Sequence, residues 1–436
     1  MSRKPATKKR GASREKTDKK GEIRVRMYNV GFGDCLLFWI PTSEGERRVL
    51  VDCGYHSLGK GKFSDKELVK QIKEDLNGET LNVVVATHRH QDHISGFGET
   101  ALWESVDIEE VWLPFTANPN AVQDEPGLRL WNGLLDRIDS LWDSKGNLKP
   151  AATMALDART QDERDEAAFM LWNARANAPA IDNLLDGMKR ANGKAAKRRF
   201  LPEDRKHFPS QFTTPVLPGV TVHVLGPPTD PKFRKGREVP SSWGFGGTET
   251  DGLDGGNEPP FSKEWTIPAG SRQGRMPFQD ATLKAIRRFN DDLLYAAKKA
   301  EGFLNGESLV LVLEIGSARL LLPGDAEVGT WTTILESQDA LELASTATFL
   351  KVGHHGSHNA TPITFIDKHL PPKTTAVIST QQGSGNFRNG IPLKRLLDRM
   401  NARSMPVARS DKPPKAGDKI FTPDPGGRWI DCKISC

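Results

Sequence analysis

The chain has 436 residues, of which 37% are hydrophobic, 27% charged and 7% aromatic. This composition excludes a wholly disordered chain, and the length suits two or three average domains or one large α/β domain with insertions. No apolar run reaches the ~20 residues that a membrane-spanning helix requires, and the four cysteines do not form a disulfide or Cys-x-x-Cys pattern. We therefore expect a cytoplasmic protein with no membrane contact.

The net charge of +5 is unevenly distributed. Residues 1–20 hold nine Lys/Arg and two Asp/Glu, which is +7, so the remaining residues sum to 5 − 7 = −2. A Lys-rich segment without apolar residues is disordered on its own. We predict a disordered basic tail over residues 1–21 and one folded domain over 22–436. The tail is a candidate contact for DNA or RNA, although a solvated tail explains the charges equally well.

The first third of the folded domain alternates strands with one clear helix. Apolar runs and alternating patterns predict strands at Glu22–Val30, Cys35–Ile40, Arg47–Val51, Leu81–Ala86 and 108–114. Leu68, Ile72 and Leu76 share one face of a predicted helix over Ser64–Leu76, for which Ser64 is a suitable N-cap.

Two insertions interrupt the remaining pattern. Residues 116–218 are predicted to be a helical insertion, with helices near 127–142, 161–176 and 180–198, and residues 226–280 a Gly/Pro-rich loop. A helix is predicted at about 281–304 and another near 392–400. The later strands are predicted at Val220–Leu225, Leu309–Ile315, Ala318–Leu322, Thr348–Val352 and Thr375–Ser379.

The segment H-R-H-Q-D-H places His88, His90, Asp92 and His93 directly after a buried strand. On an extended segment the first three would share one side and His93 would turn away, which could present ligands to two neighbouring metal ions. Imidazole and carboxylate together suit Zn²⁺, Mn²⁺ or iron. With only ten histidines in the chain, three within six residues favour a metal site over a chance surface loop.

Two further strand ends carry potential ligands. Asp325 follows the run LLLPG, and His354 and His355 follow FLKVG. Taken singly, Asp325 could cap the next helix and His355 could be an ordinary loop histidine. Three such junctions in one chain favour a single metal centre.

The ordered motifs LVDCG, THRHQDH, LLLPGD and LKVGHHGS resemble those of the metallo-β-lactamase-fold hydrolases, and NVGFGDCLLF with HHGS is similar to the branch that contains the hydrolase domain of the competence protein ComEC. The resemblance spans about residues 24–417. It implies an α/β fold, an αββα sandwich with a dinuclear metal site at one edge of its two sheets.

The resemblance also implies roles for single residues. His88 and His90 would bind the first metal, Asp92, His93 and His355 the second, and Asp325 would bridge both ions. His354 would bind a substrate phosphate or protonate a leaving group, beside the catalytic Asp92. The expected outer or substrate-lining residues are Asp52, Asp34, Ser357 and His358; Asp34 could equally be a turn residue, and Ser357 and His358 could cap a loop.

One feature of many family members is missing. They supply a further histidine to the first metal, but between His93 and Asp325 this chain has only His207 and His223. His207 lies in a Lys/Arg-rich loop, and His223 lies inside a predicted strand where a packed histidine is expected. The first site would then consist of His88, His90 and the Asp325 bridge, completed by water.

These residues predict a hydrolase in which two divalent cations, Zn²⁺ or Mn²⁺, lower the pKa of a bridging water. The preferred substrate is a phosphodiester in DNA or RNA, and the basic stretch 189–206 could grip its phosphates, although a solvated helix end would look the same. The alternatives are hydrolysis of a small ester, lactone or phosphoester, and an interaction module working through insertion 116–218.

Overall fold

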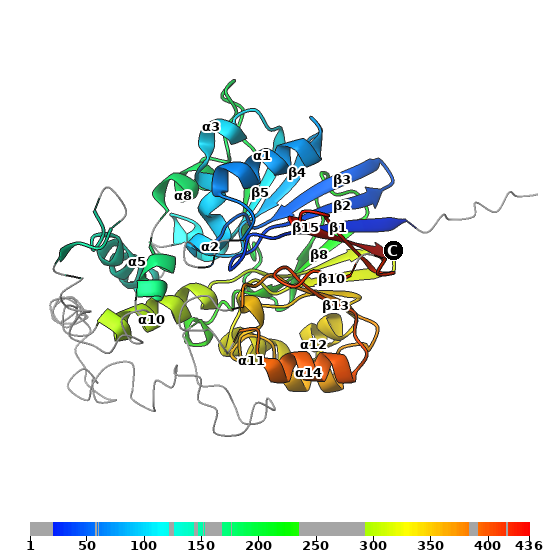
Figure 1. Ribbon diagram of the computed structural model, residues 1–436. Coiled ribbons are helices and arrows are strands. Elements are labelled where there is room, and N and C mark those ends of the chain that lie inside the picture. The colour runs from blue at the N-terminus through cyan, green and yellow to red at the C-terminus, as the bar shows by residue number, and fades with distance from the viewer. Residues whose placement is uncertain are drawn as a thin grey trace, which may run out of the picture.

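The computed structural model describes residues 21–56, 59, 61–121, 126–143, 147–150, 152, 168–175, 177–234, 293–382, 391–415 and 417–436. Residues 1–20 of the predicted basic tail and most of the predicted Gly/Pro-rich loop lie outside these residues. Two sheets pack face to face, and helices cover both outer faces (Figure 1). The predicted αββα sandwich is confirmed.

The first sheet has eight strands in the order β14-β15-β1-β2-β3-β4-β5-β6. Antiparallel pairing joins β15, β1, β2 and β3, and parallel pairing joins β3 to β6, so β3, β4 and β5 end at the same edge. The strands are β1 (Glu22–Tyr28), β2 (Leu36–Thr42), β3 (Gly45–Val51), β4 (Leu81–Val85), β5 (Ile108–Pro114), β6 (Lys197–Leu201), β14 (Phe421–Pro423) and β15 (Trp429–Ser435).

The second sheet has seven strands in the order β13-β12-β11-β10-β9-β8-β7. Strands β10 to β13 are parallel, so their following loops also share one edge. The strands are β7 (Ser210–Phe212), β8 (Val220–Gly226), β9 (Val310–Ile315), β10 (Ala318–Leu322), β11 (Phe349–Lys351), β12 (Thr375–Ile378) and β13 (Val407–Arg409).

The helices form the outer layers and one end of the sandwich. On the first sheet, α1 (Asp65–Leu76) begins with the predicted N-cap Ser64, which forms a capping box with Glu67. The other helices there are α2 (Gln91–Ile94), α3 (Thr100–Trp103) and α8 (Ala178–Leu185). The second sheet is covered by α11 (Val328–Glu336), α12 (Gln338–Ser345), α13 (Ile363–Lys368) and α14 (Lys394–Ala402). At one end, α5 (Pro126–Asp139) and α10 (Leu293–Gly306) pack together (Figure 1).

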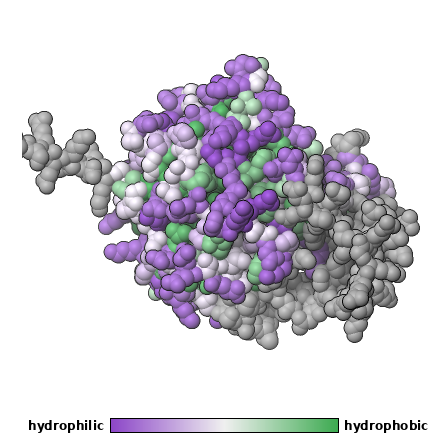
Figure 2. Space-filling model, turned by 180° about the vertical axis from the view of Figure 1, so that it is seen from behind, coloured by the Kyte–Doolittle hydropathy of each residue, from purple (hydrophilic) through white to green (hydrophobic). Residues whose placement is uncertain are grey.

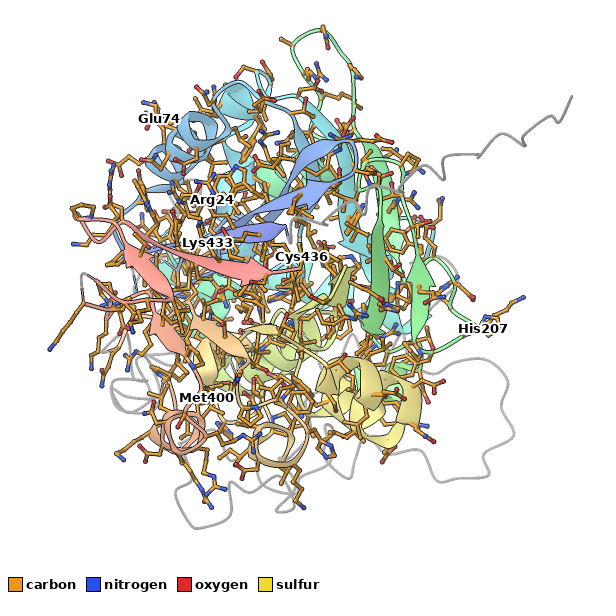
Figure 3. All side chains as sticks on the ribbon, turned by 90° about the vertical axis from the view of Figure 1, so that its right-hand side faces the viewer. Arg24, Glu74, His207, Met400, Lys433 and Cys436 are labelled. Atoms are coloured by element: carbon orange, nitrogen blue, oxygen red, sulfur yellow. The ribbon has the colours of Figure 1, made fainter. Side chains whose placement is uncertain are left out.

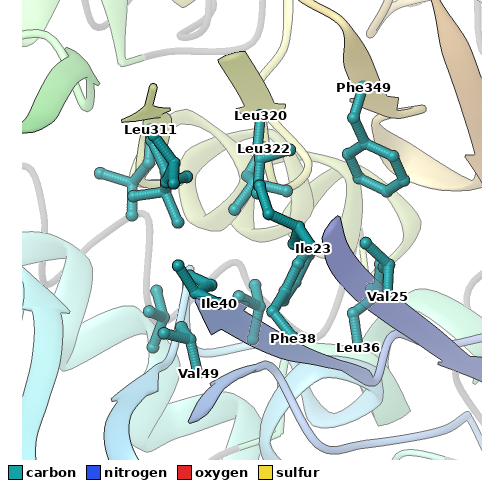
Figure 4. Close-up of a cluster of buried hydrophobic side chains, with 14 of the residues drawn as sticks. Ile23, Val25, Leu36, Phe38, Ile40, Val49, Leu311, Leu320, Leu322 and Phe349 are labelled. Carbon is teal, nitrogen blue, oxygen red and sulfur yellow. The ribbon is translucent and has the colours of Figure 1, made fainter. Parts of the chain in front are cut away.

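The main core lies between the two sheets. Alternate residues of β1, such as Ile23 and Val25, point inward and meet residues of the second sheet such as Leu320 and Phe349 (Figure 4). All four are at most 1% exposed, and burying each such side chain contributes about 1.5–3 kcal/mol. This shared core fixes the position of one sheet relative to the other, and therefore the positions of their strand ends.

The prediction of a helix at 180–198 is wrong in its second half. Helix α8 ends at Leu185, and Gly187, at φ 75°, turns the chain into a loop that leads to β6. The sequence of Lys197–Leu201 resembles a polar helix end, but the segment is a strand in which Lys197 and Arg198 are exposed and Arg199 is buried. Arg199 donates to the buried carboxylate of Glu110, 2.9 Å away. The predicted insertion therefore contains edge strands of both sheets, β6 and β7.

Within the described residues, no helix is long and apolar enough to cross a membrane. The face seen in Figure 2 is mainly hydrophilic, with hydrophobic residues in small separate patches. Phe208 and Ile420 are the large hydrophobic side chains that are exposed among the described residues.

Candidate metal centre

The H-R-H-Q-D-H segment leaves the end of β4 and turns at once into α2. The predicted extended conformation is therefore wrong from Gln91 onward, since His93 lies in a helical turn. This turn brings His93 back toward His88, and their ring centroids lie 4.1 Å apart. The side chains of His88, His90, Asp92 and His93 are at most 1% exposed.

Each cluster histidine points one ring nitrogen at another candidate ligand. Nε2 of His88 lies 2.8 Å from Nδ1 of His90, Nε2 of His93 lies 3.1 Å from Oδ2 of Asp325, and Nε2 of His355 lies 3.1 Å from Oδ2 of Asp92. We call these the inner nitrogens. The strand ends of both sheets thus meet at one buried cluster of the six predicted ligands, His88, His90, Asp92, His93, Asp325 and His355.

The pair His354–His355 is separated by backbone conformation. Both residues have positive φ, 46° and 53°, a left-handed conformation that costs a non-glycine residue about 1–3 kcal/mol. The turn places His355 in the cluster, while His354 lies at its border and donates its backbone N–H to Oδ1 of Asp325 at 2.9 Å. Asp325 does not cap the next helix, whose N-cap is Glu327.

We call the second ring nitrogen of each cluster histidine its outer nitrogen. Three of these four outer nitrogens contact neighbouring groups. Nδ1 of His93 lies 2.8 Å from Oδ2 of Asp52, Nδ1 of His88 lies 3.0 Å from Oγ1 of Thr87, and Nδ1 of His355 lies 2.9 Å from the carbonyl oxygen of Ser379. Asp52 also accepts bonds from the N–H and hydroxyl of Thr87. Such outer contacts are what fix a histidine ring for metal binding.

A buried lysine lies behind the cluster. Lys351, at the end of β11, contacts the carboxylate of Asp34, and its Nζ is 3.3 Å from Oδ1 of Asp325. Asp34 also approaches Nδ1 of His93 at 3.7 Å, and its backbone N–H donates to the carbonyl of Asp92. Asp34 is thus joined to the cluster by charge and by backbone.

The buried charges shift one another's pKa values. Burial alone would lower the pKa of His93, but Asp325, Asp52 and Asp92 raise it well above its usual value. Burial alone would raise the pKa of Asp325, but His93 and Lys351 hold it well below its usual value. The neighbouring cations thus favour the charged form of the Asp325 carboxylate, the form in which a carboxylate binds a metal ion.

The residues fit a metal centre by two observations. Three triplets have candidate donor atoms within 4.8 Å of one another among the described residues, and two of them consist of predicted ligands: His88, His93 and Asp325, and Asp92, His93 and His355. The third is Asp34, Asp52 and His93. Nε2 of His93 and Oδ1 of Asp92 are also buried without a hydrogen-bond partner. Buried polar atoms are rarely left unsatisfied, so these donors are arranged for a ligand. With nitrogen and oxygen donors only, the set suits Zn²⁺ or Mn²⁺.

Two glycines of the sequence motifs, Gly33 and Gly54, allow the ligand segment to pack closely against the loops that follow β1 and β3. A Cβ on Gly54 would lie 2.6 Å from the carbonyl oxygen of Gln91, and one on Gly33 would lie 2.8 Å from that of Asp92. No real Cβ packs this closely, so a side chain at either position would push α2 away from the sheet.

The remaining predicted residues fall around or away from the centre. Ser357 is buried, with Oγ 3.0 Å from Nδ1 of His354, and His358 is partly buried nearby in the chain. His207 is exposed on an outer loop (Figure 3) and pairs with Asp204, and His223 pairs with Glu314, as a packed strand histidine does. Neither supplies the further histidine of the first site.

The basic stretch 189–206 is partly neutralised within the protein. Lys189 pairs with Asp186, Arg190 contacts Asp107, and Arg199 pairs with Glu110. Its capacity to grip phosphates is therefore smaller than its sequence indicates.

Sequence reasoning missed three residues beside the cluster. They are Lys351, Glu301 of α10, whose Oε2 is 3.2 Å from Nε2 of His90, and Asn173, whose Oδ1 accepts the N–H of Asp92 at 3.2 Å. Lys351 lies within the motif LKVGHHGS, so its position beside a ligand strand end was a usable signal. Nothing local in the sequence links the other two to the cluster.

A family model, the metallo-beta-lactamase superfamily, matches residues 28–119. This match covers β2 to β5 and includes the H-R-H-Q-D-H segment. It supports a metal-dependent hydrolase and agrees with the observed sandwich. No curated protein matches the chain.

Proposed function

We propose that this protein is a metal-dependent phosphodiesterase that acts on DNA or RNA. The observation that carries the proposal is the convergence of six His and Asp side chains from both sheets on one buried centre. Two divalent cations bound there would polarise a phosphoryl oxygen and lower the pKa of a bound water, the chemistry that hydrolyses phosphodiesters.

Each side chain of the centre has a proposed role that follows from its position. His88 and His90 would hold the first ion and Asp92, His93 and His355 the second, with Asp325 between them. Asp52 keeps the inner nitrogen of His93 directed at the cluster through its bond to Nδ1. Asp34 supports the same edge through Lys351.

His354 is the proposed contact to substrate. It borders the cluster with 13% of its side chain exposed, while the six ligand residues are buried. Oγ of Ser357 and Oδ1 of Asn359 lie against its Nδ1, and its Nε2 lies 3.9 Å from Oε1 of Glu301. We assign His354 to phosphate binding or to protonation of the leaving group, with Ser357 and His358 lining the approach.

The basic tail is the proposed source of polyanion attraction, because the rest of the chain sums to −2. Each neutralised phosphate contributes ~0.9 to the slope of log K against log salt for duplex DNA and ~0.7 for single strands. The test compares the full chain with a chain lacking residues 1–20 and with one whose nine tail Lys/Arg are replaced by Gln.

Both variants should bind single-stranded DNA and RNA more weakly and with a flatter salt slope. Their hydrolysis of a small chromogenic phosphodiester should equal that of the full chain, since all six ligands lie beyond residue 87. A full chain that cleaves neither nucleic acid with Zn²⁺ or Mn²⁺ supplied, and binds neither, would end the nuclease proposal.

A second candidate, hydrolysis of a small ester, lactone or phosphoester, is favoured by a cavity of about 330 Å³ beside His88. Its walls are mainly apolar, with Leu113, Ile181 and Leu184 among them, and its volume is at the lower end of the usual range for small-ligand pockets, ~300–1,000 Å³. Turnover of an apolar ester, reduced by Leu184→Lys, would support this candidate over the first.

A further inference from the structure

The outer nitrogen of His90 is held differently from those of the other cluster histidines. The other three are bonded to Thr87, Asp52 and Ser379, groups that lie next to ligand-bearing strand ends. Because Nδ1 of His90 faces His88, Nε2 is its outer nitrogen, and it lies 3.2 Å from Oε2 of Glu301. Both atoms are buried, and the pair lies at ion-pair distance without hydrogen-bond geometry, so neither atom has a hydrogen-bond partner among the described residues.

Glu301 comes from a helix outside the two sheets. It lies on α10, 211 positions after His90 in the chain. Neighbouring residues Ala300, Phe303 and Leu304 pack α10 onto α5, in a hydrophobic cluster shared with Leu128, Leu135 and Ile138. The packing of α10 on α5 therefore sets the position of the Glu301 carboxylate.

The same end of α10 contacts the site at two further points. Nδ2 of Asn305 donates to Oε1 of Glu327 at 2.8 Å. Arg89, the residue between His88 and His90 in the chain, pairs through its guanidinium with Glu307, the residue after α10, at 2.9 Å. Glu307 and Asn305 are fully buried. The Glu301–His90 and Arg89–Glu307 contacts join α10 and the residue after it to the ligand segment, and the Asn305–Glu327 bond joins α10 to the start of α11. The approach of α10 to His90 therefore does not depend on one flexible side chain.

We propose that Glu301 is a positioning residue for the first metal: it accepts a hydrogen bond from Nε2–H of His90, keeps Nδ1 turned toward His88, and adds a negative charge beside two neutral ligands. A carboxylate behind a histidine orients the ring and increases its basicity as a ligand. The proposal rests on the metal centre of the proposed function and gives the α5–α10 pair a role in it.

The test measures metal binding without substrate. Glu301→Gln, Glu301→Ala and the control Glu74→Gln, on the surface of α1 (Figure 3), are titrated with Zn²⁺ against a chromogenic chelator. Loss of such an outer partner typically weakens metal affinity about 10–100-fold. We expect a loss of that size for one ion only, larger in Glu301→Ala than in Glu301→Gln, whose amide oxygen still accepts from His90.

The visible spectrum of the Co²⁺-substituted protein should change in Glu301→Ala, which a residue that only stabilises the fold would not cause. Thermal melting of the metal-free Glu301→Gln protein should match that of Glu74→Gln. Two ions bound at wild-type affinity in Glu301→Ala, or equal loss of both, would overturn the proposal. Because no substrate is present, these results are independent of whether the protein cleaves phosphodiesters.

Discussion

Lys351 and Asp325 form a buried pair in which Nζ lies 3.3 Å from Oδ1. Oδ1 also accepts the backbone N–H of His354, so two donors occupy one oxygen of this carboxylate. The other oxygen, Oδ2, faces Nε2 of His93 and Nε2 of His355 at 3.1 and 3.7 Å. The geometry therefore directs a single oxygen of Asp325 toward the position between the two proposed ions.

Replacing Lys351 by Met should reduce the free energy of unfolding of the metal-free protein by about 3–5 kcal/mol, because the buried carboxylates of Asp34 and Asp325 lose their shared lysine partner. Adding Asp34→Asn should restore part of this loss. Urea unfolding in the presence of a chelator measures both values. Equal destabilisation in the single and double variants would show that the charge pairing is not the cause.

The change Asp325→Asn should lower metal occupancy at both positions, since the amide lacks the charge of a bridging carboxylate. Elemental analysis of purified protein, with Glu336→Gln on the exposed end of α11 as the matched control, measures this. Full metal content in the Asp325 variant would contradict the assignment.

The two adjacent histidines should behave differently. His355→Ala should lose both metal and activity, because Nε2 of His355 faces Asp92 and Asp325. His354→Ala should keep its metal and lose mainly turnover, since its imidazole lies at the border of the cluster. Metal content and kcat are measured for both variants. Loss of metal in His354→Ala but not in His355→Ala would show that His354 is the ligand and His355 the substrate contact.

Acid should destabilise the fold through His56. Burial lowers the pKa of this histidine to about 4, with Asp92 and the carbonyl of Phe169 opposing. Its folded pKa is below the unfolded value, so the unfolded state takes up a proton first as the pH falls. Stability is present above about pH 6.5 and is lost between about 6.5 and 4, by up to ~3 kcal/mol.

The variant His56→Phe keeps a ring stacked on Phe169 but removes this titration. Urea unfolding of the metal-free proteins is measured at pH 7, 5.5 and 4. The free energy of unfolding of the wild type, relative to that of His56→Phe, should decrease as the pH falls. Parallel curves for the two proteins would refute the assignment to His56.

The strands and most of the proposed ligands could be predicted because their signals are local. The H-R-H-Q-D-H segment is six residues long, and each ligand follows an apolar strand. The helix end at 185 could not be predicted from basic residues alone, because Arg199 is buried by its pairing with Glu110, a partner 89 positions away. Glu301 could not be predicted either, because its partner His90 is also distant in the chain and only the packing of α10 on α5 brings the two together.

Strand β1 pairs along its whole length with β15, from Glu22 opposite Ser435 to Tyr28 opposite Trp429. During synthesis on the ribosome, β1 is made long before residues 429–435, so its second edge cannot be paired until these residues emerge. An unpaired strand edge is a site for association with other chains. Until then the nascent chain exposes that edge, so slow synthesis or truncation before residue 429 should promote aggregation.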